Sequence, residues 1–102
     1  MEKLYEILKS IDMPVSYHHF KTPISPPFIT YYRNASKNFI ADDKVYKKIN
    51  IIKIELYTKQ KDIQQEEKLE QILDENNIDY QIIAENYIDS EKIYQTIYEI
   101  AI

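Results

Sequence analysis

Residues 44–58, KVYKKINIIKIELYT, decide the kind of fold that this chain adopts. Their β-branched and aromatic side chains and alternating charges are typical of one long β-strand. Ile49 and Ile51 share one face of that strand, whereas Ile52 begins a second apolar set on the opposite face. A strand buries both sets only if the sheet contains a bulge or is covered on both faces. The stretch therefore predicts a sheet that is curved or doubly covered.

Amphipathic helices are expected on both sides of this strand. In residues 2–11, EKLYEILKSI, the apolar side chains recur at helical spacing. Residues 62–77 repeat that spacing along a narrower stripe, with Asp62 as the expected N-cap. The chain contains no glycine, so Asn76 or Asn77 is expected to take the left-handed conformation that ends the second helix.

Three acidic residues of the second predicted helix, Glu66, Glu70 and Asp74, form a ridge at i, i+4 and i+8. Like charges at this spacing are mildly unfavourable unless water screens them. We therefore expect a solvated face. The alternative is a surface that meets a basic partner.

Four shorter segments are predicted as strands because their apolar and β-branched residues alternate with polar ones: residues 15–20, 28–33, 79–87 and 92–102. The polar stretch 34–43 between two of them is predicted as a loop. Short connections favour antiparallel pairing. The sequence thus predicts one α+β domain over all 102 residues, in the order α-β-β-β-α-β-β, with a mainly antiparallel curved sheet and both helices on one face.

The stretch YHHFKTPISPPFITYY, residues 17–32, permits three interpretations: a metal site, a proline-rich ligand, or two strands joined by a stiff loop. On a strand, His18 and His19 would point to opposite faces and would not bind one ion together. Ser25 and the two prolines after it resemble a polyproline ligand, but Phe28 at once resumes the strand pattern. We therefore favour a rigid connector.

Composition excludes several classes of function. The chain has no cysteine, which removes disulfides and thiolate chemistry, and no glycine, which removes phosphate-binding loops and the nucleophile elbow. A net charge of −4 disfavours nucleic-acid recognition, which depends on clustered Lys and Arg. No apolar run is long enough for a signal core or a membrane span, so we expect synthesis in the cytoplasm and no membrane partner.

No catalytic, metal or cofactor site is predicted. Asp42 and Asp43 are the only candidate acid/base pair, and Lys37 and Lys44 beside them favour solvated charge in a polar loop. No nucleophile, base and orienting partner come together in the sequence. We therefore do not expect an enzyme.

The ten tyrosines are the most suggestive feature, above all in the last predicted strand. Tyr94, Tyr98 and Ile100 share one face of it, opposite Ile93 and Ile97. One face can line the core, whereas the other needs a cover. That cover is either a helix or a neighbouring subunit, because tyrosine is enriched at interfaces. Binding of single-stranded nucleic acid by exposed tyrosines is a further alternative, but it needs a basic groove.

Five segments in order, MPVSYHHF, PPFITYY, IADDKVYKKI, IELYTKQKD and YIDSEKIYQTIYEI, resemble a family of small structural proteins of tailed bacteriophages and prophages of Gram-positive bacteria. The chain is similar to its tail-terminator or tail-completion group. The resemblance implies a six-fold homo-oligomeric ring that caps the tail tube, contacts with the tail tube protein and the head-tail connector, a place in the virion, and no catalysis.

The candidate contact residues follow from this role. A ring subunit needs interfaces that close on themselves. The predicted loops 21–27 and 34–44, with Ser25, Lys37, Asp42 and Asp43, are candidates for contact with the tube or a neighbour. The last strand is the other candidate surface. The alternative function is a small monomeric adaptor or regulatory domain that binds another protein.

Overall fold

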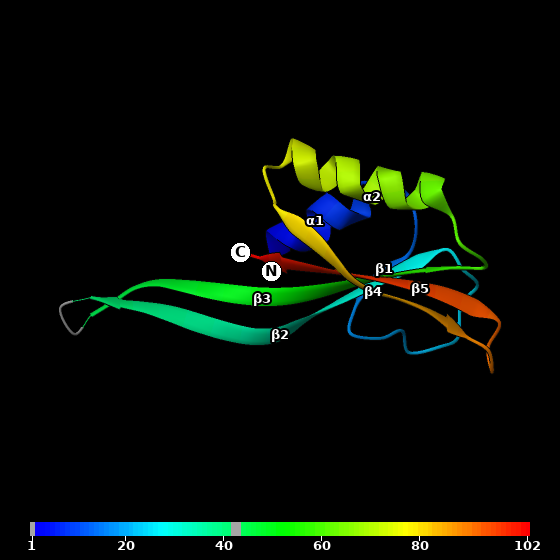
Figure 1. Cartoon of the computed structure of the whole chain (residues 1–102), viewed down its shortest axis with the longest axis horizontal. Coiled ribbons are helices and arrows are strands. Elements are labelled where there is room, and N and C mark those ends of the chain that lie inside the picture. Colours follow the sequence, from blue (N-terminus) through cyan, green and yellow to red (C-terminus); the bar gives the residue numbers. More distant parts are fainter. Residues whose placement is uncertain (1, 42–43) are drawn as a thin grey trace.

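The chain forms a five-stranded sheet with two helices packed on one face (Figure 1). The computed structural model describes the backbone of residues 2–41 and 44–102, and the side chains of these residues except 39–41 and 44–47. The elements are α1 (Glu2–Lys9), β1 (Val15–Tyr17), β2 (Phe28–Ala41), β3 (Lys44–Thr58), α2 (Ile63–Glu75), β4 (Tyr80–Ile88) and β5 (Ile93–Ala101). The predicted α+β class and element order are confirmed.

The strand order in the sheet is β1-β2-β3-β5-β4. Three of the four pairings are antiparallel, as expected, whereas β1 pairs with β2 in parallel. The connection through residues 18–27 carries the chain back to start β2 beside the first residue of β1, which makes the pairing parallel. The last strand, β5, lies between β3 and β4, so α2 crosses over one strand position.

Strand β3 has the bounds predicted from its sequence. Ile52 and its neighbours on that face are fully buried under the helices, whereas Ile49 and Ile51 are half-buried on the opposite face. A bulge in the partner strand accompanies this arrangement, because Arg33 and Ala35 pair with consecutive β3 residues and Asn34 is extra. Of the two predicted alternatives, a bulge therefore occurs beside Ile51 and Ile52, in the partner strand β2.

The hydrophobic core lies between the helices and the sheet. Leu4 and Leu8 of α1 and Leu69 and Leu73 of α2 are buried there, as their helical spacing predicts. The strands contribute eight buried residues to this cluster, namely Val15, Ile29, Tyr31, Ile52, Ile54, Leu56, Tyr98 and Ile100. No residue between 32 and 51 belongs to this core cluster among the described side chains.

The predicted loop is wrong for residues 34–41, whereas residues 42 and 43 lie outside the described residues. Strand β2 continues through this segment to Ala41, and its residues pair with β3 as far as Lys44. Asn, Ser and Lys favour turns and solvent, but pairing with an adjacent strand overrides this local preference. Strand β1 is shorter than expected, because His18 has a φ of 68° and ends it.

Capping residues fix both ends of α2. The Asp62 carboxylate accepts a hydrogen bond from the Gln65 N–H at 3.2 Å, which confirms the predicted N-cap. At the other end, Asn77 has a φ of 57° and the Ile78 N–H donates to the Leu73 carbonyl at 2.9 Å. Asn77 thus occupies the left-handed position that glycine usually fills.

Replacing the N-cap tests how much this hydrogen bond stabilises the fold. We expect Asp62→Ala to lower the free energy of unfolding by about 1 kcal/mol, because the Gln65 N–H loses its acceptor. Asp62→Asn keeps an acceptor oxygen and is expected to stay close to the wild type. Urea denaturation measures both. Equal losses in the two variants would contradict the capping role.

Candidate interaction surfaces

The outer part of the β2–β3 hairpin projects from the body of the protein (Figure 1). We call residues 33–41 and 44–50 of this hairpin the arm. The radius of gyration is 14.9 Å and the long axis extends 51 Å against 28 and 23 Å for the others. A compact domain of this size has a radius of gyration near ~13 Å. The arm is therefore a protrusion from a compact body, and no helix covers it.

The predicted loop contacts lie in different settings. Lys37 is exposed on the arm, on strand β2 instead of in a loop. Ser25 is exposed in the connection between β1 and β2. Asp42 and Asp43 lie outside the described residues.

Tyr98 and Ile100 are not available for contact with another molecule, so their prediction as interface residues is wrong. Tyr98 is 0% exposed and Ile100 2% exposed, because the face of β5 that they share lies under the helices. Tyr94 on the same face is half-buried, and its hydroxyl donates to Glu85 at 2.5 Å. The cover over this strand is a helix of the same chain.

A layer of polar contacts joins α2 to this face of the sheet. Glu66, only 6% exposed, accepts from Lys61 Nζ at 2.9 Å and from the Thr96 hydroxyl at 3.4 Å. Glu70 accepts from the Tyr98 hydroxyl at 2.8 Å and the Tyr80 hydroxyl at 3.3 Å. The prediction of a solvated acidic ridge is therefore wrong for Glu66 and Glu70.

These contacts change the proton affinities of the groups involved. Burial and the hydrogen bond to Glu70 raise the pKa of Tyr98 far above its ordinary 10.0. The hydrogen bond to Glu85 raises the pKa of Tyr94. The Lys61 ammonium lies 2.6 Å from Glu85 and lowers the pKa of that carboxyl, while the same contact raises the pKa of Lys61. The layer therefore favours neutral tyrosines and a paired lysine.

The sequence did contain a signal for this layer. Glu66, Leu69, Glu70 and Leu73 stand at i, i+3, i+4 and i+7, which is the spacing of one helix face. The hydroxyl-bearing residues of β5 alternate at a period of two, which is the spacing of one strand face. Two polar sets at matching spacings indicate a shared interface.

The opposite face of the sheet carries a second polar network. Glu55 accepts from the Thr30 hydroxyl at 2.9 Å and from the Gln95 amide at 3.3 Å. Gln95 also donates to the Tyr57 hydroxyl at 2.8 Å and accepts from Asn86 at 3.0 Å. These side chains cross four strands and satisfy one another. Their arrangement is structural, without a nucleophile activated by a base.

The described part of the chain has long unpaired strand edges on the arm and on β4. Beyond Arg33 nothing pairs with the outer side of β2, because β1 ends at Tyr17. At the other side β4 is the terminal strand. It exposes Ile82, Ile83 and Tyr87 by 45%, 41% and 52%, with a bulge at Ile83. Exposed backbone and apolar side chains on an edge strand are a template for another strand.

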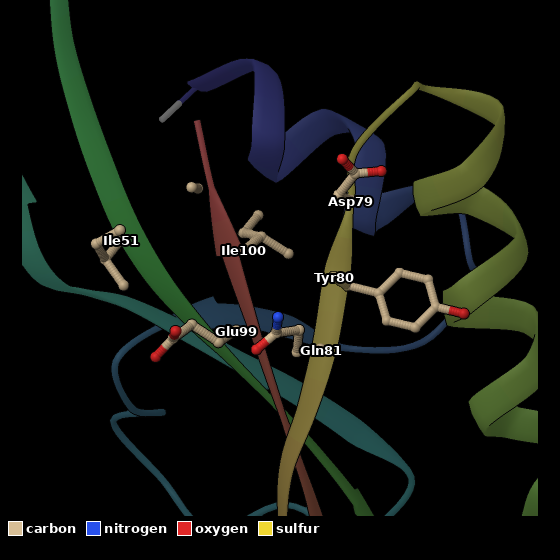
Figure 2. A pocket seen from close by; sticks show the side chains of 7 residues that line it. Ile51, Asp79, Tyr80, Gln81, Glu99 and Ile100 are labelled. Atoms are coloured by element: carbon tan, nitrogen blue, oxygen red, sulfur yellow. The ribbon is translucent and has the colours of Figure 1, made fainter.

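A shallow pocket lies where β4 begins (Figure 2). Asp79, Gln81 and Glu99 supply its polar lining, and Ile51 supplies part of its apolar lining. The Tyr80 ring points away from the pocket toward α2. The pocket holds carboxylates without a base or nucleophile partner, so its chemistry suits contact with a positively charged side chain.

The two histidines lie closer together than predicted. His18 Nδ1 and His19 Nδ1 are 3.1 Å apart, because the left-handed backbone at His18 brings the two rings to one side. The argument that a strand would separate them is therefore wrong. Among the described residues, no group of three or more His, Cys, Asp or Glu is placed to hold a metal ion.

Comparison with known proteins yields no family model and no curated protein that matches this sequence. Within the described residues, the helices are too short and too polar to cross a bilayer.

Proposed function

We propose that this protein is a structural component of a tailed bacteriophage or a phage-tail-like particle, and that it caps the tail tube as a ring and joins it to the head-tail connector. The sequence resemblance supports this proposal for the family. The arm supports it on physical grounds, since a projecting ribbon whose described side chains add nothing to the core needs another role.

The observation that supports this function most directly is the combination of a compact body with a long projecting arm. A ring subunit must contact two different neighbours through two different surfaces. The arm and the β4 edge lie at opposite sides of the sheet, so one subunit offers two such surfaces. The proposed partners are further copies of this chain in a six-fold ring, the tail tube protein and the connector. The proposed role involves no catalysis, and its place is the virion, assembled in the bacterial cytoplasm.

Deleting the gene from its phage or prophage tests this function. A cap that stops tube growth leaves tubes without a defined end when it is absent. We expect induced cells to yield heads separated from tails, and tubes of variable length, in negative-stain electron micrographs. Expression of the wild-type protein in the same cells is expected to restore joined particles. Normal particles in the deletion strain would overturn the proposal.

A further inference from the structure

The charges of this protein are divided between the arm and the body. Residues 33–50 contain five Lys or Arg and two Asp, for a net charge of +3. The whole chain carries −4, so the remaining residues carry −7. Arg33, Lys37 and Lys48 are exposed on the described part of the arm. A basic protrusion on an acidic body attracts another copy of the same body.

The body also offers a surface of suitable shape for a strand. The β4 edge presents unpaired backbone groups together with the exposed Ile82 and Ile83. The acidic pocket at the start of β4 lies on the side of β4 that faces β5 and β3, away from this edge (Figure 2). Asp79 is exposed directly before β4, so a partner strand that carries lysines can pair with the edge and place a positive charge near this carboxylate.

The arm has the matching features. Its β2 strand has a free outer edge beyond Arg33. Ser36 and Lys37 on that strand are exposed, and Lys48 is exposed on the neighbouring β3. The same chain therefore carries an unpaired basic edge on β2 and an unpaired edge next to an acidic residue on β4, on opposite sides of its sheet.

We infer that the arm of one subunit adds its β2 edge to the β4 edge of the next, so that copies of this chain associate head to tail in solution through a continuous intersubunit sheet. This inference rests on the proposed function for its ring and specifies the contact within it. Because two different surfaces meet, the interface is heterologous, and its repetition generates a ring when the rotation closes.

Cross-linking between two single-cysteine variants tests the contact. The natural chain has no cysteine, so each introduced thiol is unique. Ser36→Cys places a thiol on the arm, and Gln81→Cys places one on the β4 edge; both positions are exposed. Each variant is first shown to melt at the wild-type temperature. A short bis-maleimide is expected to link the two variants when they are mixed, and to link neither variant alone. Linkage of Ser36→Cys to itself would show an isologous contact and overturn the inference.

Charge reversal tests the electrostatic part. We expect Lys37→Glu with Lys48→Glu to weaken self-association about tenfold, measured by light scattering over a concentration series. Adding Asp79→Lys to that variant is expected to recover part of the loss. The matched control, Lys3→Glu with Lys68→Glu, makes the same charge change on the exposed surfaces of the two helices and is expected to retain association. Equal weakening by the control would overturn the assignment of the arm.

Apolar contact is tested separately. Ile83→Lys is expected to abolish association, whereas Ile63→Lys, at a side chain that is also exposed but lies on α2, is expected to leave it intact. A strict monomer at every concentration would overturn the inference. The inference would also be overturned if the variants did not cross-link and the arm instead bound a random DNA duplex at physiological salt. The basic side chains of the arm would then bind phosphate groups and not another subunit.

The deletion experiment distinguishes a failure of the proposed contact from a failure of the proposed function. If deletion of the gene abolishes joined particles but the Ser36→Cys and Gln81→Cys variants do not cross-link, the proposed contact is overturned and the proposed function stands. Normal particles on deletion, with the cross-links formed, overturn the proposed function and leave self-association standing.

Discussion

Raising the pH above about 10 is expected to unfold this protein, and Tyr98 is expected to be a main cause. Its hydroxyl is fully buried and donates to the Glu70 carboxylate, and its pKa is raised above the ordinary 10.0. Between the ordinary and the raised pKa the folded state holds a proton that the unfolded state releases. The stabilisation is therefore complete below pH 10.0 and is lost as the pH rises.

The expected loss is steep. For each buried tyrosine that stays neutral in the folded state, the free energy of unfolding falls by up to about 1.4 kcal/mol per pH unit above the pKa of the unfolded state. Tyr31, Tyr57 and Tyr80 also have raised pKa values, chiefly because of burial, and add to the loss in the same direction. Urea denaturation at a series of pH values from about 8 to about 11.5 measures the slope.

Two variants separate Tyr98 from the other groups. Tyr98→Phe is expected to be less stable at neutral pH by about 1–2 kcal/mol, because a hydrogen bond to a charged group is lost. Above pH 10 its stability is expected to fall with a shallower slope than that of the wild type. Tyr87→Phe changes a half-exposed tyrosine and is expected to keep the wild-type slope. A wild-type slope in Tyr98→Phe would contradict the role of Tyr98.

Shortening the arm is expected to abolish assembly while leaving the fold intact. Ser36 pairs with Asn50, so a two-residue Asn-Gly loop can replace residues 37–49 and close the hairpin at that pair. No described side chain in the replaced segment contributes to the core cluster. We therefore expect the melting temperature to stay within a few degrees of the wild type, since little buried surface is lost.

The functional effect of the same change is expected to be large. A shortened protein lacks Lys37, Lys48 and most of the free β2 edge, so it should fail to restore joined particles in the deletion strain. Wild-type protein expressed in parallel is the control. Restoration of joined particles by the shortened protein would show that the arm is dispensable and would contradict its proposed role.

The sequence predicted the body of this fold well, because burial constrains it. The stripes of α1 and α2 and the long strand β3 carry apolar spacings that only one secondary structure satisfies. Asp62 and Asn77 acted as the caps that their positions indicated, since a helix end has few ways to satisfy its backbone groups.

The arm was missed because none of its described side chains belongs to the core under the helices. Asn34, Ser36 and Asn38 have the composition of a loop, and only the pairing with β3 shows that they form a strand. The contact residues proposed on β5 failed for a different reason. A tyrosine at an interface and a tyrosine under a helix have the same strand spacing, and the choice depends on where α2 packs.

Glu66 and Glu70 show that a charged residue on a helix is not always exposed to solvent. On a helix that packs across several strands, the buried face is wider than its apolar stripe, and carboxylates on that face find hydroxyl and ammonium partners. Two of the partners, Thr96 and Tyr98, lie 30 and 28 positions away from Glu66 and Glu70 in sequence. The spacing of α2 alone therefore does not identify them, and only its comparison with the spacing of β5 indicates the shared interface.

The separation of the arm from the core also shapes how this protein can change over evolutionary time. Substitutions in the body are filtered by folding, because they alter packed volume or buried hydrogen bonds. Substitutions in the arm escape that filter and are selected by the surface that the arm meets. Under the proposed function, lineages that adapt to a new partner can change the arm while they keep the body, so one fold can serve particles whose other components have diverged.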